Sequence, residues 1–167
     1  MNLYLLRHAI AAERGTSDYG SDAERPLTDE GVAKMRRLAR SMKALGLEFE
    51  AIVSSPYLRA RQTAEVVAKV LGWGEPVLLT PLLAPDGDRR ELVSWLNRDY
   101  GEGKGVMLVG HEPYLSELAS VLSAGTTTAS LDMRKGGLCW LTANGLRYGQ
   151  CATLRWLLPP KVLGLVR

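Results

Sequence analysis

Two kinds of hydrophobic pattern alternate along most of the chain. Short runs of consecutive apolar residues are typical of buried strands, and they occur at residues 3–6, 49–56, 76–83 and 106–109. Apolar residues that recur every three or four positions predict amphipathic helices, and they occur at residues 28–46, 57–72, 89–101 and 114–122. Strands that alternate with helices indicate an α/β fold with a mainly parallel sheet.

Turn-forming and helix-capping residues divide the remaining sequence. Residues 9–27 are rich in Gly, Ser, Asp and Ala without a period, which predicts a loop, and Thr28 is a suitable N-cap for the helix that follows. Near the end, "GGLCWLTA" and "CATLRWLL" are separated by the turn-like "NGLRYG", which predicts an antiparallel pair of strands. The last third of the chain is therefore predicted to form an antiparallel pair of strands, whereas strands alternate with helices in the earlier part.

Charged and reactive residues follow the ends of three predicted strands. Arg7 and His8 come after the first strand, Arg59 after the second, and His111 after the strand at 106–109. In a parallel α/β sheet, ligands bind beyond the carboxyl ends of the strands. We therefore expect these four side chains to share one crevice. The chain has only two histidines, and both fall at this edge.

Arginines beside two histidines favour phosphoryl chemistry over metal binding. Two distant histidines with arginines alongside are a poor cage for a cation. The planar guanidinium of arginine can donate parallel hydrogen bonds to two phosphate oxygens. A phosphoryl group in transfer carries its charge on three such oxygens, so arginines suit it. A neutral imidazole can attack phosphorus while a second one, best when protonated, binds a phosphoryl oxygen. Cationic neighbours lower the pKa of a histidine and keep the attacking one neutral.

Composition narrows the class of protein further. The 167 residues, 46% of them apolar, suit a single domain over 1–167. There is no membrane-length apolar run and no signal-peptide pattern, and Cys139 and Cys151 have no metal or redox spacing, so we expect a cytoplasmic, soluble protein that does not contact a membrane. The net charge of +3 does not imply nucleic acid, and the basic residues within 34–43 are interpreted as the solvated side of a helix.

Ordered motifs give the chain a family resemblance. It resembles the histidine phosphatase superfamily, which includes phosphoglycerate mutases and acid phosphatases, and within it the SixA-type phosphohistidine phosphatases. The motifs that carry the resemblance are "LRHA", "RPLTDEG", "SSPYLRARQTAEVV", "PLLAPDGD", "VGHEP" and "LRWLLPPKVL". Together they span nearly the whole chain.

The resemblance implies a fold and a role for each residue of the crevice. The fold would be a three-layer α/β/α sandwich around a mainly parallel sheet with one antiparallel strand, as in phosphoglycerate mutases. His8 would be the nucleophile that becomes transiently phosphorylated, Arg7 and Arg59 would bind the phosphoryl group, and His111 would complete the pocket. The resemblance implies a role in signal transduction. It implies no metal and no organic cofactor.

The identity of a general acid stays open at this point. Glu112 occupies the position of the proton donor in related acid phosphatases, but a carboxylate before a helix is also a common cap. Asp86 or Asp88 falls in the turn where mutase-like relatives place theirs. Asp18 and Asp22, in the loop after His8, are expected to be exposed rather than catalytic.

The length of the segment that could cover the pocket helps to choose between the candidate substrates. Only 23 residues lie between Pro81 and Gly105, and a turn and a helix use most of them. An open pocket suits a phosphoryl group on a protein surface, and phosphohistidine has a nitrogen leaving group that needs no strong acid. We therefore expect a phosphatase acting on protein phosphohistidine. A small-molecule phosphomonoesterase and a non-catalytic phosphate-binding module are the alternatives.

Overall fold

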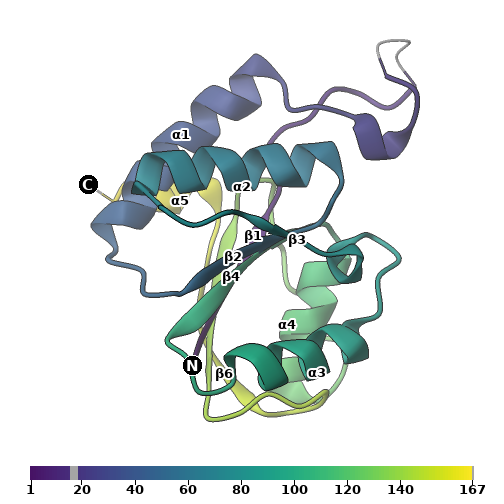
Figure 1. Cartoon of the computed structure of the whole chain (residues 1–167), viewed down its shortest axis with the longest axis vertical. Coiled ribbons are helices and arrows are strands. Elements are labelled where there is room, and N and C mark those ends of the chain that lie inside the picture. Colours follow the sequence, from purple (N-terminus) through teal and green to yellow (C-terminus); the bar gives the residue numbers. More distant parts are fainter. Residues whose placement is uncertain (16–18, 167) are drawn as a thin grey trace.

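A six-stranded sheet runs through the middle of the molecule in the computed structural model, which describes residues 1–15 and 19–166 (Figure 1). The strands lie in the order β3-β2-β4-β1-β5-β6. Their bounds are β1 (Asn2–Arg7), β2 (Ala51–Ser54), β3 (Leu78–Leu79), β4 (Gly105–Gly110), β5 (Leu138–Ala143) and β6 (Ala152–Leu158). Only β5 runs against its neighbours, β1 and β6. The mainly parallel sheet with an antiparallel strand is thus confirmed.

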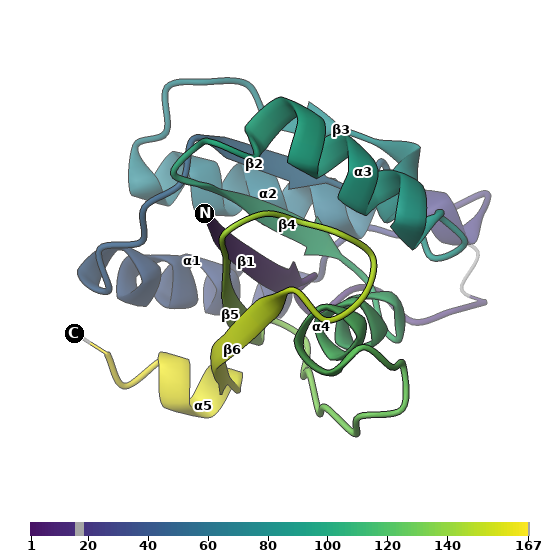
Figure 2. The same cartoon turned by 90° about the horizontal axis from the view of Figure 1, so that it is seen from below.

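Helices cover both faces of the sheet, as Figures 1 and 2 show. The helices are α1 (Asp29–Ala44), α2 (Leu58–Leu71), α3 (Arg89–Tyr100), α4 (Tyr114–Ala124) and α5 (Pro160–Leu163), with short 3-10 turns η1 (Asp22–Glu24) and η2 (Pro81–Leu83). One face carries α1, α2 and the short α5, and the other carries α3 and α4. The α/β/α layering that the resemblance implies is therefore present. No helix within the described part of the chain has the length and apolar character needed to cross a membrane.

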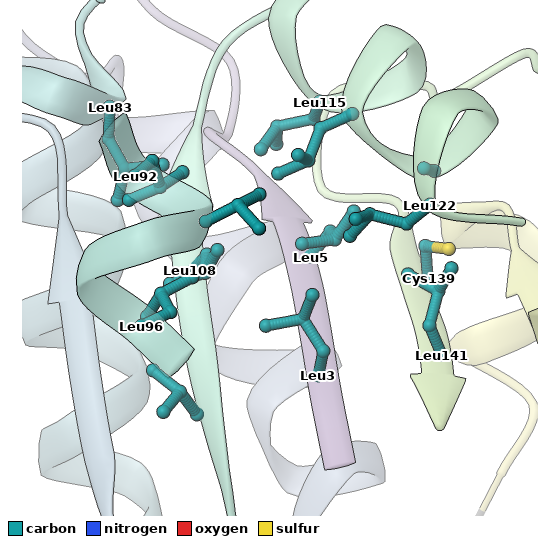
Figure 3. Packing of buried hydrophobic residues seen from close by; sticks show 14 of the residues in the cluster. Leu3, Leu5, Leu83, Leu92, Leu96, Leu108, Leu115, Leu122, Cys139 and Leu141 are labelled. Atoms are coloured by element: carbon teal, nitrogen blue, oxygen red, sulfur yellow. The ribbon is translucent and has the colours of Figure 1, made fainter. Parts of the chain in front are cut away.

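Alternation of side chains along β1 divides the core in two. Leu3 and Leu5 pack toward α3 and α4 (Figure 3), whereas Tyr4 and Leu6 pack toward α1 and α2. Successive side chains of a strand point to opposite faces, so a strand covered on both sides must be apolar throughout. This explains why the first apolar run is continuous rather than alternating.

Capping residues set one end of three helices, and the N-cap at Thr28 is the one that the sequence predicts. Thr28 Oγ1 accepts a hydrogen bond from the Gly31 amide at 3.0 Å at the start of α1. The Asp88 carboxylate accepts hydrogen bonds from the first amides of α3, at 2.7 and 3.1 Å. Gly72 ends α2 with a φ of 71°, a left-handed conformation that glycine adopts without steric cost.

The expected strand at 76–83 is much shorter in the structure. Only Leu78–Leu79 pairs with β2, and both side chains are exposed at the edge of the sheet. Pro81 has no amide hydrogen to continue the ladder, and Thr80 Oγ1 accepts from the Leu82 amide to begin η2 instead. The prediction of a full strand here was wrong because the proline interrupts an otherwise apolar run.

The carboxyl ends of the central strands meet at one edge of the sheet. The His8 amide donates to the Gly110 carbonyl at 3.0 Å, which joins the residues after β1 to the end of β4. The Ser55 amide donates to the Val109 carbonyl at 3.0 Å, which joins the end of β2 to the same strand. This edge holds the candidate site.

Candidate active site

All four residues predicted at the strand ends line one pocket of about 260 Å³, here called the histidine pocket. Arg7 ends β1, His8 follows it, Arg59 lies in the first turn of α2, and His111 follows β4. The two imidazole rings are 5.2 Å apart between centroids. His8, Arg59 and His111 are almost completely buried, at 5%, 2% and 2% exposure. The structure therefore brings together the residues that sequence reasoning expected to share a crevice.

The hydrogen bond of His8 defines which ring nitrogen is free. Nδ1 lies 2.7 Å from the carbonyl oxygen of Ala9. A carbonyl only accepts, so Nδ1 must carry the proton, and the lone pair of the neutral ring is on Nε2. The next residue is also fixed, because the Ala9 amide donates to Thr63 Oγ1, which in turn donates to the Arg59 carbonyl. The orientation of His8 is thereby tied to α2.

His111 is oriented from the end of β2. The Tyr57 amide donates to Ser55 Oγ at 3.2 Å, and the same hydroxyl lies 2.8 Å from His111 Nε2. A serine hydroxyl has one proton and two acceptor lone pairs, so Ser55 Oγ can accept from the Tyr57 amide and still donate its proton to His111 Nε2. The remaining proton of a neutral His111 is then on Nδ1, a buried atom with no partner among the described residues. This N–H is available to an anion in the pocket.

Both histidines are held in the neutral form. Burial lowers the pKa of His8 to about 3, with further lowering by His111, Arg59 and Arg7. Burial also lowers the pKa of His111 to about 3, and Arg59 contributes to the decrease. A neutral His8 is the state that the predicted nucleophile requires. His111 is therefore neutral here, whereas a protonated imidazole would bind a phosphoryl oxygen more strongly. A phosphoryl dianion beside His111 would raise the pKa of its imidazole.

Several buried donors in this pocket lack partners. The Nε atoms of Arg7, Arg25 and Arg59 are buried without a hydrogen-bond partner among the described residues, as is His111 Nδ1. Leaving a buried donor unsatisfied is costly, and such atoms call for an acceptor. All four belong to residues that line the histidine pocket, so the site is suited to an anion with several oxygens. In the described part of the chain, no three His, Cys, Asp or Glu side chains gather to hold a metal ion.

Three further cationic side chains, which sequence reasoning did not single out, also line the pocket. Arg14 and Arg25 come from the connection between β1 and α1, and Lys135 comes from the turn before β5. Arg25 belongs to the "RPLTDEG" motif, which was its only sequence signal. Arg14 and Lys135 have no local signal, because their positions depend on how long loops fold back over the strand ends.

Asp22, which the sequence predicts to be exposed rather than catalytic, is partly exposed and joins the arginines of the pocket. Its carboxylate lies 3.0 Å from Arg59 Nη2, 3.3 Å from Arg25 Nη2 and 3.2 Å from Arg14 Nε. Burial raises the pKa of Asp22, but the three guanidinium groups outweigh this effect and hold its pKa below the usual value. Only part of its side chain is exposed. Asp22 therefore positions the arginines. Asp18, the other aspartate of this loop named from the sequence, lies outside the described residues.

The candidate general acids occupy different surroundings. Glu112 lines the histidine pocket, and its Oε1 accepts a hydrogen bond from the Ser116 amide at 3.0 Å in the first turn of α4. It is therefore a helix cap and a pocket residue together, and burial raises its pKa. Asp86 is exposed beside Pro85, which lines the pocket, while Asp88 caps α3.

The fold and the histidine pocket define an α/β protein with an anion site built around two neutral histidines, and comparison with known proteins places it. Residues 3–84 match the histidine phosphatase superfamily, branch 1. The chain is 34% identical to phosphohistidine phosphatase SixA of Escherichia coli, over 76% of this chain and 77% of that protein. It therefore belongs to the histidine phosphatase superfamily, a membership that supports phosphatase activity.

Other relatives resemble the chain over nearly its full length. An uncharacterised protein from Picosynechococcus sp. is 37% identical over 95% of this chain and all of that one. The structure of the protein histidine phosphatase SixA complexed with tungstate superposes with a TM-score of 0.82 at 29% identity, covering 96% of this chain and 98% of that one. The chain is thus similar to SixA-type phosphohistidine phosphatases in sequence and in structure.

The same fold also occurs in a protein that binds phosphoserine. A variant of phosphoserine phosphatase from Entamoeba histolytica, in complex with phosphoserine, has a TM-score of 0.71 at 17% identity, with 97% of this chain and 98% of that one covered. At this identity the likeness concerns the fold alone. The substrate must therefore be argued from the pocket.

Proposed function

We propose that this protein hydrolyses phosphohistidine on a protein substrate, through a phosphorylated His8. The observation that carries the proposal is the orientation of His8, whose Nε2 lone pair is freed by the Nδ1 hydrogen bond to Ala9, inside a pocket lined by arginines. The similarity to proteins named phosphohistidine phosphatase supports the choice of substrate. The tungstate bound by a similar protein supports a pocket for the phosphoryl group, since tungstate is an oxyanion like phosphate.

The first chemical step transfers the phosphoryl group to His8. The Nε2 lone pair forms a bond to phosphorus as the bond from phosphorus to the substrate nitrogen breaks. The electron pair of that bond leaves with the substrate imidazole, which takes up a proton. Arg7, Arg59 and the Nδ1–H of His111 hold the phosphoryl oxygens while charge is redistributed.

The second step returns His8 to its starting state. Water attacks the phosphorus of phosphorylated His8, and the bond from phosphorus to Nε2 breaks with its electron pair returning to Nε2. Inorganic phosphate is released with the oxygen and the protons of the attacking water. Because the pKa of free His8 is lowered to about 3, the regenerated imidazole is again neutral and ready for the next turnover.

The size of the pocket supports a substrate that presents only its phosphoryl group. Its volume of about 260 Å³ is below the roughly 300–1,000 Å³ of sites that enclose a whole small ligand. The rest of the substrate must then stay outside, as a protein carrying phosphohistidine does. A small phosphate ester is the second candidate, because the half-buried Glu112 offers a proton donor beside the pocket.

The test compares phosphate release from three substrates. These are a phosphotransfer protein phosphorylated on histidine, an aryl phosphate and phosphoglycerate, each assayed with the full chain. We expect the largest kcat/KM for the phosphoprotein. Equal or faster hydrolysis of the small esters would contradict the proposed substrate, and tight phosphate binding without turnover of any of the three would favour a binding module.

Replacing Glu112 by glutamine separates its capping role from acid catalysis. Glutamine Oε1 still accepts from the Ser116 amide, so α4 should begin as before. An alkoxide or aryloxide leaving group needs a proton more than an imidazole does, so we expect kcat on the aryl phosphate to fall by about 10²-fold and kcat on phosphohistidine by less than about fivefold. Steady-state kinetics on both substrates measure this.

The matched control for Glu112→Gln is Asp86→Asn at the exposed turn beside the pocket. We expect it to change neither rate constant. If Asp86→Asn instead lowers ester hydrolysis while Glu112→Gln does not, the proton donor is Asp86 and Glu112 is only a cap.

A further inference from the structure

A second hollow adjoins the histidine pocket and shares two of its residues. This hollow, here called the lysine groove, has a volume of about 750 Å³ and is lined in part by Arg7 and Lys135, which also line the histidine pocket. It extends from these residues to Lys34 on α1 and Lys161 on α5. It is thus larger than the histidine pocket and adjacent to it.

Positive charge predominates in the lysine groove. Its lining includes five basic side chains and one carboxylate, Asp132, which lies 2.7 Å from Arg134 Nε. The three lysines, Lys34, Lys135 and Lys161, form no ion pair with a carboxylate of the described residues. Clustered cations without partners raise the local positive potential and attract an anionic surface.

Apolar side chains line the groove beside these cations. Ile10, Pro159 and Val162 contribute to it, and Val162 is 46% exposed. A purely electrostatic surface would not need them. A lining that combines apolar and charged side chains is typical of protein interfaces, in which apolar contact supplies affinity and charge supplies orientation.

We propose that the lysine groove binds the acidic and partly apolar surface that surrounds the phosphohistidine of a protein substrate. This inference rests on the proposed function, and it names the chemistry of the partner. The phosphoryl group enters the histidine pocket while carboxylates beside the phosphohistidine meet Lys34, Lys135 and Lys161. The interpretation of the basic residues within 34–43 as only a solvated helix face then no longer applies to Lys34.

Charge complementarity favours a protein over a small anion as the occupant. The histidine pocket already accommodates one phosphoryl group, and the lysine groove adds about 750 Å³ with cations distributed over α1, the turn before β5 and α5. A single small metabolite would not use all of these positions and the exposed Val162 together. A folded partner with an acidic patch contacts them at once.

The decisive experiment reverses two charges that lie outside the histidine pocket. The double variant Lys34→Glu/Lys161→Glu is assayed on a phosphotransfer protein phosphorylated on histidine, with carboxylates around that histidine, and on free phosphohistidine. We expect the ratio of kcat/KM for the protein to that for the free amino acid to fall by about tenfold or more, mainly through KM for the protein. The ratio for the wild type should also fall as ionic strength rises.

A matched control places the same charge change elsewhere on α1 and α2. Lys43 and Lys69 line a separate hollow between these helices with Arg36 and Arg40. The variant Lys43→Glu/Lys69→Glu should leave the ratio within about twofold of the wild type. The milder Lys34→Gln/Lys161→Gln variant should give an intermediate ratio, which guards against an effect of misfolding.

The outcomes separate this inference from the proposed function. If the wild type hydrolyses the phosphoprotein but the groove and control variants have the same ratio, the lysine groove is not the docking surface and the proposed function stands. If the wild type hydrolyses free phosphohistidine or an aryl phosphate but not the phosphoprotein, the proposed function itself is wrong. If the groove variant instead raises KM for a small anionic ester, the groove serves that substrate and the inference is overturned.

Discussion

Replacement of His8 by alanine is expected to lower phosphate release by about 10⁴-fold or more, because it removes the group that forms the bond to phosphorus. The imidazole is oriented by its Nδ1 hydrogen bond to Ala9, and no other nitrogen base of the pocket offers the same lone pair, since His111 Nε2 faces the Ser55 hydroxyl. Initial rates with the phosphoprotein, at saturating concentration, measure the effect.

Two controls distinguish a lost nucleophile from a damaged pocket. His8→Ala keeps Arg7 and Arg59, so it should still bind inorganic phosphate or tungstate, which calorimetry can detect. It should also fail to take up label from the phosphoprotein, whereas His111→Ala should still become phosphorylated, though slowly. Retention of more than about one per cent of wild-type turnover by His8→Ala would show that another group attacks phosphorus.

The stability of the protein should decrease by several kcal/mol as the pH falls from about 7 to about 4, and the two buried histidines should be a main cause. Folding lowers the pKa of both His8 and His111 to about 3, from an ordinary value near 6.5. Between these values the unfolded chain binds protons that the folded chain does not. Acid therefore favours unfolding, by up to about 1.4 kcal/mol per pH unit for each histidine.

Urea unfolding at a series of pH values tests this linkage. The variant His111→Asn should lose about one proton's share of the slope between pH 6.5 and 5, because asparagine does not titrate. The chain has only two histidines, so no third one contributes in this range. An unchanged slope in both His111→Asn and His8→Asn would mean that the histidines are not held neutral in the folded protein.

The central features of the site could be predicted because they depend on periodic elements. Arg7, His8 and His111 follow continuous apolar runs, and parallel strands place their carboxyl ends at one edge whatever the details of packing. Arg59 follows the same rule through α2. These positions needed only the order of strands and helices, which the hydrophobic pattern carries.

The parts that sequence reasoning missed depend on irregular segments. Arg14 and Arg25, with Asp22 paired to them, belong to a long connection that has no period. Among its described residues, the regular features are an isolated bridge between Ala11 and Leu27 and the turn η1. The path of such a connection is decided by tertiary contacts, such as the ion pair of Asp22 with Arg59. Local composition indicates a loop and nothing about where its charges lie.

The histidine pocket is built from parts of unequal local stability. His8 and His111 follow strands that are buried between two layers of helices, whereas Asp22 and the largely exposed Arg14 belong to the connection that forms the wall. Residues 19–24 of that connection include no buried residue, so opening them costs less free energy than unfolding the sheet. Mild denaturing conditions should therefore inactivate the protein before the sheet unfolds. They would release Arg59 and Arg25 from the Asp22 carboxylate while the strands remain paired.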